Sequence, residues 1–293
     1  MSTVPKPIVP RSALRDLSTG AAVSVAVILH AMPLPDVRRH ACAACVLLAF
    51  ASAAAAQDLI NPDRPGIADG SKVVGARRFQ IETAIQHESR DEIHTIFIPT
   101  LVRIGAGDRF EIRVEGNTFT HEAGVSGFAP LSIGAKYTLV DSKDGPTLGV
   151  IVRGFPASGS KDFKTEHFTA DVRLAADIPL GPKFSLNPNA GLARYEDGSG
   201  ETFAAGLFAC TLNYQPSETL NPFVDIGYQS STGRRTDASV TLDAGLAYII
   251  GRNIQVDVSA GQGVSGDAPR PFVAAGLSIR LGAGSIRHPS VSR

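Results

Sequence analysis

Apolar and polar residues alternate one by one along most of this chain from residue 77 onward. Phe110, Ile112 and Val114, for example, alternate with glutamate and arginine residues. A period of two places successive side chains on opposite faces of a β-strand, so each such stretch predicts a strand with one apolar and one polar face. No stretch after residue 56 sustains the period of an amphipathic helix. The alternation is clearest at residues 79–86, 110–115, 131–139, 168–178, 240–248, 254–259 and 273–281.

The connections between these stretches are of two kinds. Tight turns are predicted at residues 105–108, 141–146, 180–183, 215–219 and 251–253. Longer polar or glycine-rich loops are predicted at residues 121–127, 157–165, 196–200, 229–236 and 262–269. Short turns at one end and longer loops at the other are typical of outer-membrane barrels. We therefore predict an all-β fold, a transmembrane up-and-down antiparallel β-barrel of about twelve strands over residues 77–281.

A soluble β-sandwich is the alternative, because its strands also alternate with a period of two. The barrel is favoured because nearly every stretch carries one clean apolar face and one face with charged groups. In a barrel the apolar face meets lipid and the polar face meets the lumen, and closure pairs every backbone group, as lipid requires. With 6% aromatic residues and no tryptophan, the aromatic girdles of such a barrel should be sparse.

A secretion signal precedes the strands. Arg38 and Arg39 are followed by the apolar run 41–51 and by small residues that end at Ala56. A basic region, a short apolar region and an Ala-x-Ala exit are typical of a cleaved signal peptide, and the apolar run is too short for a membrane helix. We predict cleavage after Ala56 and export to the outer membrane of a Gram-negative bacterium.

The ends of the chain complete the predicted organisation. Met32 is well placed as the start of the signal peptide, which makes residues 1–31 an over-extended start. The apolar run 21–31 is a competing signal region. Residues 57–76 are predicted to form a periplasmic N-terminal segment, and residues 282–293 a polar C-terminal tail.

Charge and cysteine content exclude several classes of protein. The 28 basic and 28 acidic residues give no basic excess for nucleic-acid binding, and 43% hydrophobic residues exclude a disordered chain. Removing residues 1–56 takes away five basic and two acidic residues and leaves a net charge of about −3. Cys42 and Cys45 lie inside the signal, so their C-x-x-C spacing predicts no redox or metal site. Cys210 remains alone, so no internal disulfide is expected. No cofactor is expected either, because the sequence shows no nucleotide-binding glycine loop and no metal-binding motif.

Charged residues on the polar faces are the candidates for function, because they would point into the lumen. Either they set the field of a pore and select solutes, or they pair with one another and fill a barrel too narrow to conduct. Twelve strands lie between filled eight-stranded barrels and open sixteen-stranded porins, so both interpretations stay open and can coexist. The candidates are Glu82, Glu111, Arg113, Glu115, Lys136, Arg153, Asp171, Arg173, Asp177, Asp243, Asp257 and Arg280.

A short motif before the first strand combines Asp63, Arg64, Asp69 and Gly70. Aspartates beside glycine turns often present oxygen ligands for Ca²⁺, so an ion site or a plug at the periplasmic mouth is one interpretation. A capped turn before the first strand is the other, and it is the one we favour from the sequence.

Some outer-membrane barrels hydrolyse lipids, which requires a nucleophilic serine, a histidine and a third, orienting group. Ser126 and Ser265 lie in predicted loops, but their surroundings only approximate the G-x-S-x-G elbow and lack its strand-to-helix context. The histidines are scattered and show no metal-binding motif. We therefore predict that the protein is neither an enzyme nor a metal site. The histidines near predicted strand ends are His87, His94, His121 and His167.

Three segments carry a family resemblance. They are residues 63–70 (DRPGIADG), 131–137 (LSIGAKY) and 266–281 (GDAPRPFVAAGLSIRL). Over about residues 61–281 the chain resembles the transporter-like outer-membrane family labelled "putative MetA-pathway of phenol degradation". The resemblance implies a barrel that carries small hydrophobic or aromatic solutes, with membrane lipid and the outer-membrane assembly machinery as partners. A closed structural or surface barrel with binding loops is the alternative. The chain departs from such barrels by ending in a polar tail rather than on an aromatic residue.

Overall fold

The computed structural model describes residues 58–90, 93–234, 236–265 and 271–282. In these residues it has thirteen β-strands and no helix. None of the described residues forms a helix long and apolar enough to cross a membrane. The predicted start, the signal peptide and the polar tail beyond residue 282 lie outside the described residues. The strands are β1 (Phe79–Arg90), β2 (Ile93–Gly105), β3 (Phe110–Glu122), β4 (Val125–Gly127), β5 (Ser132–Val140), β6 (Thr147–Phe155), β7 (Thr169–Pro179), β8 (Phe184–Glu196), β9 (Thr202–Tyr214), β10 (Leu220–Gln229), β11 (Ser239–Ile250), β12 (Ile254–Ser265) and β13 (Phe272–Leu281).

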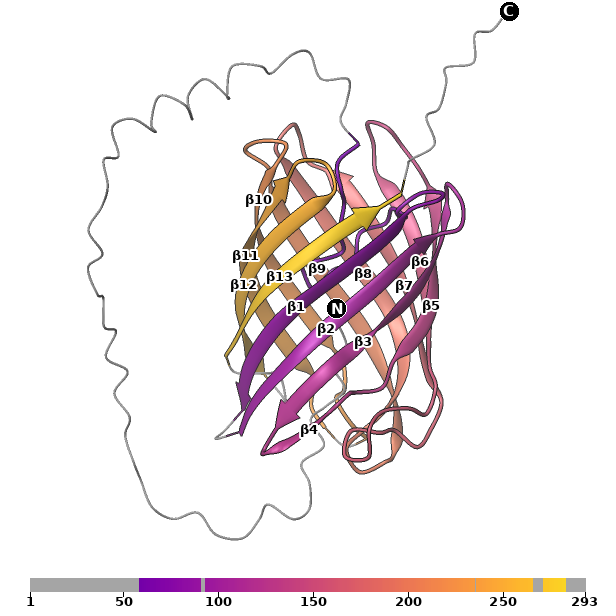
Figure 1. Ribbon diagram of the computed structural model, residues 1–293, viewed down its shortest axis with the longest axis vertical. Coiled ribbons are helices and arrows are strands. Elements are labelled where there is room, and N and C mark those ends of the chain that lie inside the picture. Colours follow the sequence, from indigo (N-terminus) through magenta and orange to yellow (C-terminus); the bar gives the residue numbers. More distant parts are fainter. Residues whose placement is uncertain (1–57, 91–92, 235, 266–270, 283–293) are drawn as a thin grey trace, which may run out of the picture. The chain divides into compact units, whose positions relative to one another are not determined.

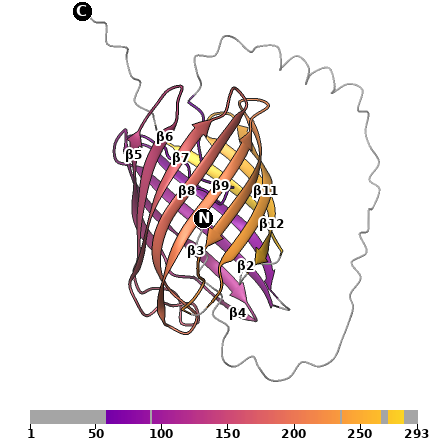
Figure 2. The same cartoon turned by 180° about the vertical axis from the view of Figure 1, so that it is seen from behind.

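Twelve of the strands close into a barrel (Figures 1 and 2). Each strand pairs antiparallel with its neighbours in sequence, and β1 pairs with both β2 and β13. Ile81 of β1, for example, lies opposite Val102 on one side and Ile279 on the other. The thirteenth strand, β4, is a three-residue strand that pairs with the end of β3. The predicted antiparallel barrel of about twelve strands is therefore confirmed.

The two ends of the barrel differ in the length of their connections. One end has the short turns at residues 106–109, 141–146, 180–183, 215–219 and 251–253. The other end has the longest connections, among them residues 156–168 and 230–238, although β1 and β2 are separated there by only two residues. Outer-membrane barrels place short turns in the periplasm and longer loops outside the cell, so β1 begins and β13 ends at the periplasmic end.

The outer face of the barrel is apolar. Ile85, Ile133 and Leu192 are each at least 60% exposed on this face. Exposed aromatic rings lie near strand ends, where girdles meet the two membrane interfaces. The aromatic girdles are thus sparse, as expected, and consist of a small number of rings near the two ends of the barrel. The periplasmic ring comprises Phe110, Tyr137, Phe184, Tyr214 and Tyr248, and the outer ring comprises Phe119, Phe128, Phe168 and Tyr228.

The inner face of the barrel is polar and buried. On β3, Glu111 and Arg113 are at most 1% exposed, whereas Ile112 between them is 40% exposed. The alternation seen in the sequence therefore divides lumen from lipid, as predicted. The pairing of β2 with β3 shifts by one residue between Ile98 and Pro99, where β3 carries the extra residue Thr118, and proline fits such a position because it has no N–H to donate to the ladder.

The division of the two faces can be tested on neighbouring residues of β7. Leu174 is 49% exposed on the outer face, whereas Arg173 is 2% exposed on the inner face. We expect Leu174→Arg to destabilise the folded barrel in lipid vesicles by about 2–4 kcal/mol, because it places a cation near the middle of the lipid face. Arg173→Leu should also change stability, by removing a cation from Asp171. Urea titration in vesicles measures both, and a tolerated Leu174→Arg with a silent Arg173→Leu would reverse the assignment of faces.

Candidate functional site

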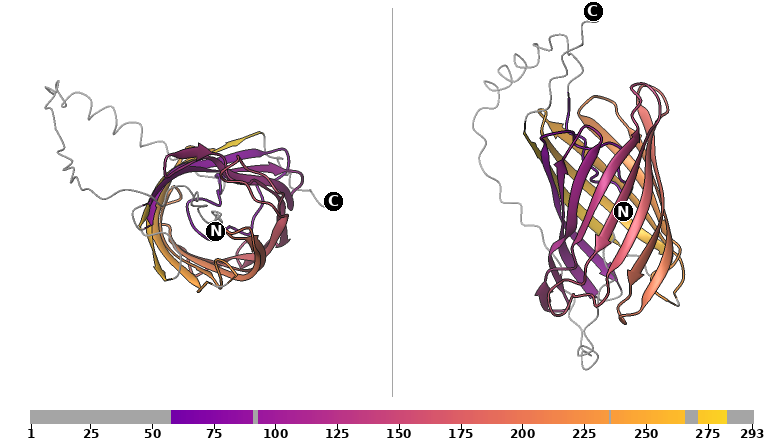
Figure 3. Two further views of the ribbon diagram at one scale, coloured as in Figure 1. Left: turned by 90° about the horizontal axis from the view of Figure 1, so that it is seen from below. Right: turned by 90° about the vertical axis from the view of Figure 1, so that its right-hand side faces the viewer.

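The segment before β1 lies inside the barrel. Residues 59–78 form no strand and run through the lumen, as the view along the barrel axis shows (Figure 3). We call this segment the plug. The prediction that residues 57–76 form a periplasmic segment is therefore wrong for the described part, because side chains of the inner face bind that part within the barrel. A Cβ at Gly149 of β6 would lie 2.4 Å from the carbonyl oxygen of Ser71, so the wall there has no room for a side chain.

The plug has no strand partner, so its backbone N–H groups need other acceptors. Side chains of five different strands supply them. The acceptors are Glu82 Oε2 for Arg64 N–H (3.0 Å), Asp225 Oδ2 for Ile67 N–H (2.8 Å), Asn189 Oδ1 for Asp69 N–H (2.9 Å), Asp177 Oδ2 for Ser71 N–H (3.2 Å) and Glu111 Oε2 for Val74 N–H (2.8 Å).

The carbonyl groups of the plug are bound in the same way. Arg103 of β2 donates to the carbonyl oxygens of Asn61 (3.2 Å) and Lys72 (2.9 Å). Lys136 of β5 donates to the carbonyl oxygen of Gly70 (2.7 Å). A single arginine thus binds two points of the plug that are eleven residues apart in sequence. Wall side chains therefore determine the path of the plug.

Asp63 of the plug is surrounded by cations. Lys136 Nζ lies 2.8 Å from both carboxylate oxygens, Arg113 Nη1 lies 2.5 Å from Oδ2, and Arg103 Nη1 lies 3.5 Å from Oδ1. Burial alone would raise the pKa of Asp63, but Arg103, Lys136 and Arg113 together lower it to about 2. A depressed pKa means that the stabilisation is complete above about pH 4 and is lost as the pH falls toward 2. Asp63 therefore binds the wall as a carboxylate at neutral pH.

Asp69 and Arg64 bind the plug to two further parts of the wall. Asp69 Oδ1 accepts a hydrogen bond from Arg113 Nη2 (2.9 Å), and its Oδ2 lies 3.6 Å from Arg173 Nη1. Arg64 Nη2 donates to Asp257 Oδ1 on β12 (3.1 Å). The acidic residues of the plug thus meet cations of β2, β3, β5 and β7, and its arginine meets an acidic residue elsewhere on the wall.

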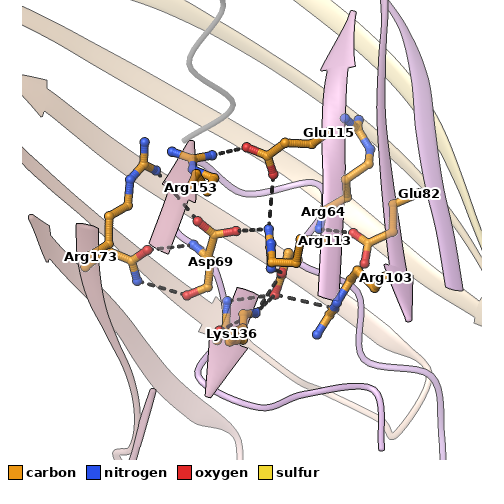
Figure 4. Close-up of polar contacts among 12 residues, drawn as sticks. Arg64, Asp69, Glu82, Arg103, Arg113, Glu115, Lys136, Arg153 and Arg173 are labelled. Atoms are coloured by element: carbon orange, nitrogen blue, oxygen red, sulfur yellow. Dashed lines mark hydrogen bonds and ion pairs between the residues drawn. The ribbon is translucent and has the colours of Figure 1, made fainter. Parts of the chain in front are cut away.

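The wall cations are also paired with wall carboxylates (Figure 4). Arg103 binds Glu82 (3.0 Å) and Glu111 (2.9 Å), and Arg153 binds Asp171 (2.5 Å). Arg113 also lies near Glu111 (3.3 Å), and Glu115 binds both Arg113 (3.3 Å) and Arg153. Glu115 therefore connects the ion pairs around Arg103 and Arg113 with those around Arg153. Charges buried in this way are tolerated only when they are paired, so the inner wall and the plug form one ionic network.

Comparison with known proteins places the chain in a family. The family model described as "Putative MetA-pathway of phenol degradation" matches residues 62–281. The chain belongs to this family. The match begins one residue before Asp63 and ends with β13, so the family region includes most of the plug as well as the barrel. The resemblance noted in the sequence is therefore confirmed.

Solved structures agree with the fold of this family member. An outer membrane channel from Pseudomonas putida F1 aligns with a TM-score of 0.59 at 10% identity, over 74% of this chain and 99% of the channel. The NanC porin aligns with a TM-score of 0.50 at 10% identity, over 69% of this chain and 100% of the porin. No curated protein matches the sequence. The chain thus has a β-barrel fold that is also found in an outer membrane channel and in a porin.

All twelve predicted lumen residues of this family member lie on the inner face. Eight of them join the ionic network around the plug, namely Glu82, Glu111, Arg113, Glu115, Lys136, Arg153, Asp171 and Arg173. The other four lie elsewhere on the inner wall: Asp257 forms an ion pair with Arg64 of the plug, Asp177 binds Ser71, Arg280 donates to the carbonyl oxygen of Leu59, and Asp243 lies opposite Asp225 on β10. That these residues line a path for solutes stays a prediction.

Several inner-face residues were not among those predicted from the sequence. Arg103 is the most connected of them, and its neighbours Val102 and Ile104 do alternate with it. The signal was obscured because another inner-face residue of β2, Phe97, is apolar although it is fully buried on the same face as Arg103. Asn189 and Asp225, which bind backbone N–H groups of the plug, were also missed, since nothing in their own strands marks them as plug contacts.

The motif of Asp63, Arg64, Asp69 and Gly70 combines two of the predicted arrangements. Gly70 N–H donates to Asp63 Oδ1 (3.0 Å), which closes a local turn. The same carboxylate holds the plug against the wall, so the capped turn that we favoured from the sequence is only part of its structure. Within the described residues, no group of three or more His, Cys, Asp or Glu side chains is arranged to hold a metal ion.

The hydrolase candidates are only partly brought together. His121 Nδ1 lies 2.7 Å from Ser126 Oγ across the β3–β4 hairpin. In the part of the chain that the structure describes, no carboxylate contacts His121 to orient it. Ser265 donates to the carbonyl oxygen of Ala238 (3.3 Å) and has no described histidine partner. The third group that such catalysis requires is therefore not seen beside either serine.

Proposed function

We propose that this protein is an outer-membrane channel, not an enzyme, and that the plug gates it. The observation that carries the proposal is the way in which the plug is held. From Asn61 to Val74, the described bonds between plug and wall run through wall side chains, whereas the strands of the barrel are joined by their own ladder. The plug can therefore leave its position without opening the barrel. Plugged lumens are a known design of outer-membrane barrels.

The solutes that we propose are small hydrophobic or aromatic compounds. The description of the family names phenol degradation, which supports an aromatic solute. A barrel of twelve strands is wide enough to hold the plug and, once the plug moves, to pass a small molecule rather than a polymer. Passage through such a lumen is passive or facilitated, since nothing in the described residues couples it to an energy source.

A reversible tether tests the gate. Ser71 Oγ and Thr147 Oγ1 lie 2.5 Å apart, so Ser71→Cys with Thr147→Cys places two thiols at the plug–wall contact. Cys210→Ser provides a background without the native thiol. We expect oxidation to lower the flux of small solutes in liposome-swelling assays, because the disulfide holds the plug in place, and we expect dithiothreitol to restore the flux.

The single variant Ser71→Cys in the same background is the matched control and should not respond to oxidant. Equal flux before and after tethering would show that solutes do not require the plug to move. No flux in any state, with the barrel folded, would favour the closed structural or surface barrel instead.

A further inference from the structure

An aromatic cluster lines the inner face of the barrel at its extracellular end. It consists of Phe155 at the end of β6, Tyr195 next to the end of β8, and Phe203 at the start of β9. Tyr195 stands edge-on to both neighbours, with ring centroids 5.8 Å from Phe155 and 6.3 Å from Phe203. Separations and angles of this kind are the favourable ones for aromatic pairs. Leu207 of β9, which is 6% exposed, extends the apolar surface inward.

The hydroxyl group of Tyr195 has its own partners. It donates to Asp171 Oδ2 (2.5 Å) and accepts from Arg173 Nη2 (3.3 Å). Arg153 binds the same Asp171 and also lies over the ring of Phe155, 5.5 Å from its centroid. The side chain of Tyr195 is chemically a phenol. Its surroundings therefore show what this wall offers to any phenol: two ring edges, an anionic acceptor and a cationic donor.

We propose that this cluster is the extracellular recognition site for small aromatic solutes that carry a hydroxyl group, and that Tyr195 occupies it when no solute is bound. The proposal deepens the channel function and rests on it. A solute ring takes the place of the Tyr195 ring between Phe155 and Phe203, and its hydroxyl donates to Asp171. A ring without a hydroxyl leaves Asp171 and Arg173 without this partner, which should weaken its binding on the order of tenfold.

The position of the cluster fits an entry site. It lies beside the long connection of residues 156–168 and the loop of residues 197–201, so a solute from outside the cell meets it first. Arg173, which donates to the Tyr195 hydroxyl, also lies 3.6 Å from Asp69 of the plug. A solute bound in place of Tyr195 is therefore next to the plug contact that must open for passage.

Fluorine NMR titration of 4-fluorophenol against the folded, detergent-purified barrel tests the site without requiring transport. We expect Tyr195→Ala to bind 4-fluorophenol at least about tenfold more tightly than the unchanged protein, because the internal competitor is gone. Adding Phe203→Ala should cancel most of that gain. For Tyr195→Ala, 4-fluorotoluene should bind on the order of tenfold more weakly than 4-fluorophenol.

Tyr228→Ala is the matched control, because Tyr228 lies near the same end of the barrel but faces outward. A heat-dependent shift on SDS gels establishes that each variant is folded. If Tyr195→Ala does not fold, Tyr195→Phe replaces it and should bind 4-fluorophenol more tightly than the unchanged protein. The proposed site would be overturned if the Tyr195 variant bound 4-fluorophenol no more tightly than the unchanged protein. It would also be overturned if the variant bound 4-fluorophenol and 4-fluorotoluene with equal affinity. The tether assay would be unaffected by that result, so failure of the site and failure of the gate are distinguishable.

Discussion

Replacing Asp63 and Asp69 of the plug by asparagine should raise the time-averaged conductance of the channel at least about tenfold. The two carboxylates contact four wall cations, Arg103, Arg113, Lys136 and Arg173. A hydrogen bond to a charged group contributes about 1.5–3 kcal/mol, and 1.4 kcal/mol changes an equilibrium tenfold. Losing even one such contact in net terms therefore shifts the plug strongly toward its released position. Single-channel recording in planar bilayers measures the effect.

The control for this double variant lies in the same segment. Lys72 binds the wall through its carbonyl oxygen, and its side chain is exposed, so Lys72→Gln changes a plug charge without removing an anchor. It should leave conductance unchanged. An unchanged conductance in the Asp63→Asn and Asp69→Asn protein would mean that the ion pairs do not keep the plug in place. The same rise in both variants would indicate a general effect of plug charge on the pore rather than release.

The fold was predictable because the physical reason for it is local. Lipid outside and charge inside impose a period of two on every strand, and Glu111, Ile112 and Arg113 display that period without reference to any other part of the chain. Strand β2 shows the limit of this signal, because Phe97 is apolar and yet is buried on the same face as Arg103. The polarity of the residues therefore does not alternate along the whole of β2, and this weakens the evidence for Arg103.

The candidate site was predictable only in part, because the plug leaves no periodic signal. Its path depends on side chains up to 221 residues away, such as Arg280, which donates to the carbonyl oxygen of Leu59. The sequence places charged groups on the inner face, but it does not show what they bind. The contacts among the aromatic rings could not be predicted from the sequence either. Phe155, Tyr195 and Phe203 come together through the pairing of separate strands, so no spacing in the sequence marks them as a cluster.

The inner charges explain how a plugged barrel can be stable without strand pairing of the plug. A wall of cations alone would repel itself, and a wall of carboxylates alone would do the same. Here Arg103 is shared between Glu82 and Glu111 of the wall and Asp63 of the plug. The plug thus enters a network that is already nearly balanced, and its release leaves the wall cations with partners of their own.

Removing Arg113 should therefore be the most damaging single change for stability. Its guanidinium contacts four carboxylates, those of Asp63 (2.5 Å), Asp69 (2.9 Å), Glu111 (3.3 Å) and Glu115 (3.3 Å). Arg113→Met keeps most of the volume but leaves these buried carboxylates facing an apolar side chain. Breaking a buried ion pair from one side costs about 3–5 kcal/mol. We expect a loss of this size in the free energy of unfolding, measured by urea titration in lipid vesicles.

A second substitution separates the loss of the cation from the loss of packing. Adding Asp69→Asn to Arg113→Met removes one of the unpaired carboxylates, so the double variant should recover part of the loss, with a coupling free energy of about 1 kcal/mol or more. Arg194→Met is the control, because Arg194 is exposed and donates a hydrogen bond to Thr202 (3.0 Å), and it should change stability by no more than about 0.5 kcal/mol. Equal losses from Arg113→Met and Arg194→Met would mean that the buried network adds no more stability than an exposed contact. The gate would then have to be held by the backbone contacts of the plug, and the conductance of the Asp63→Asn and Asp69→Asn protein should stay unchanged as well.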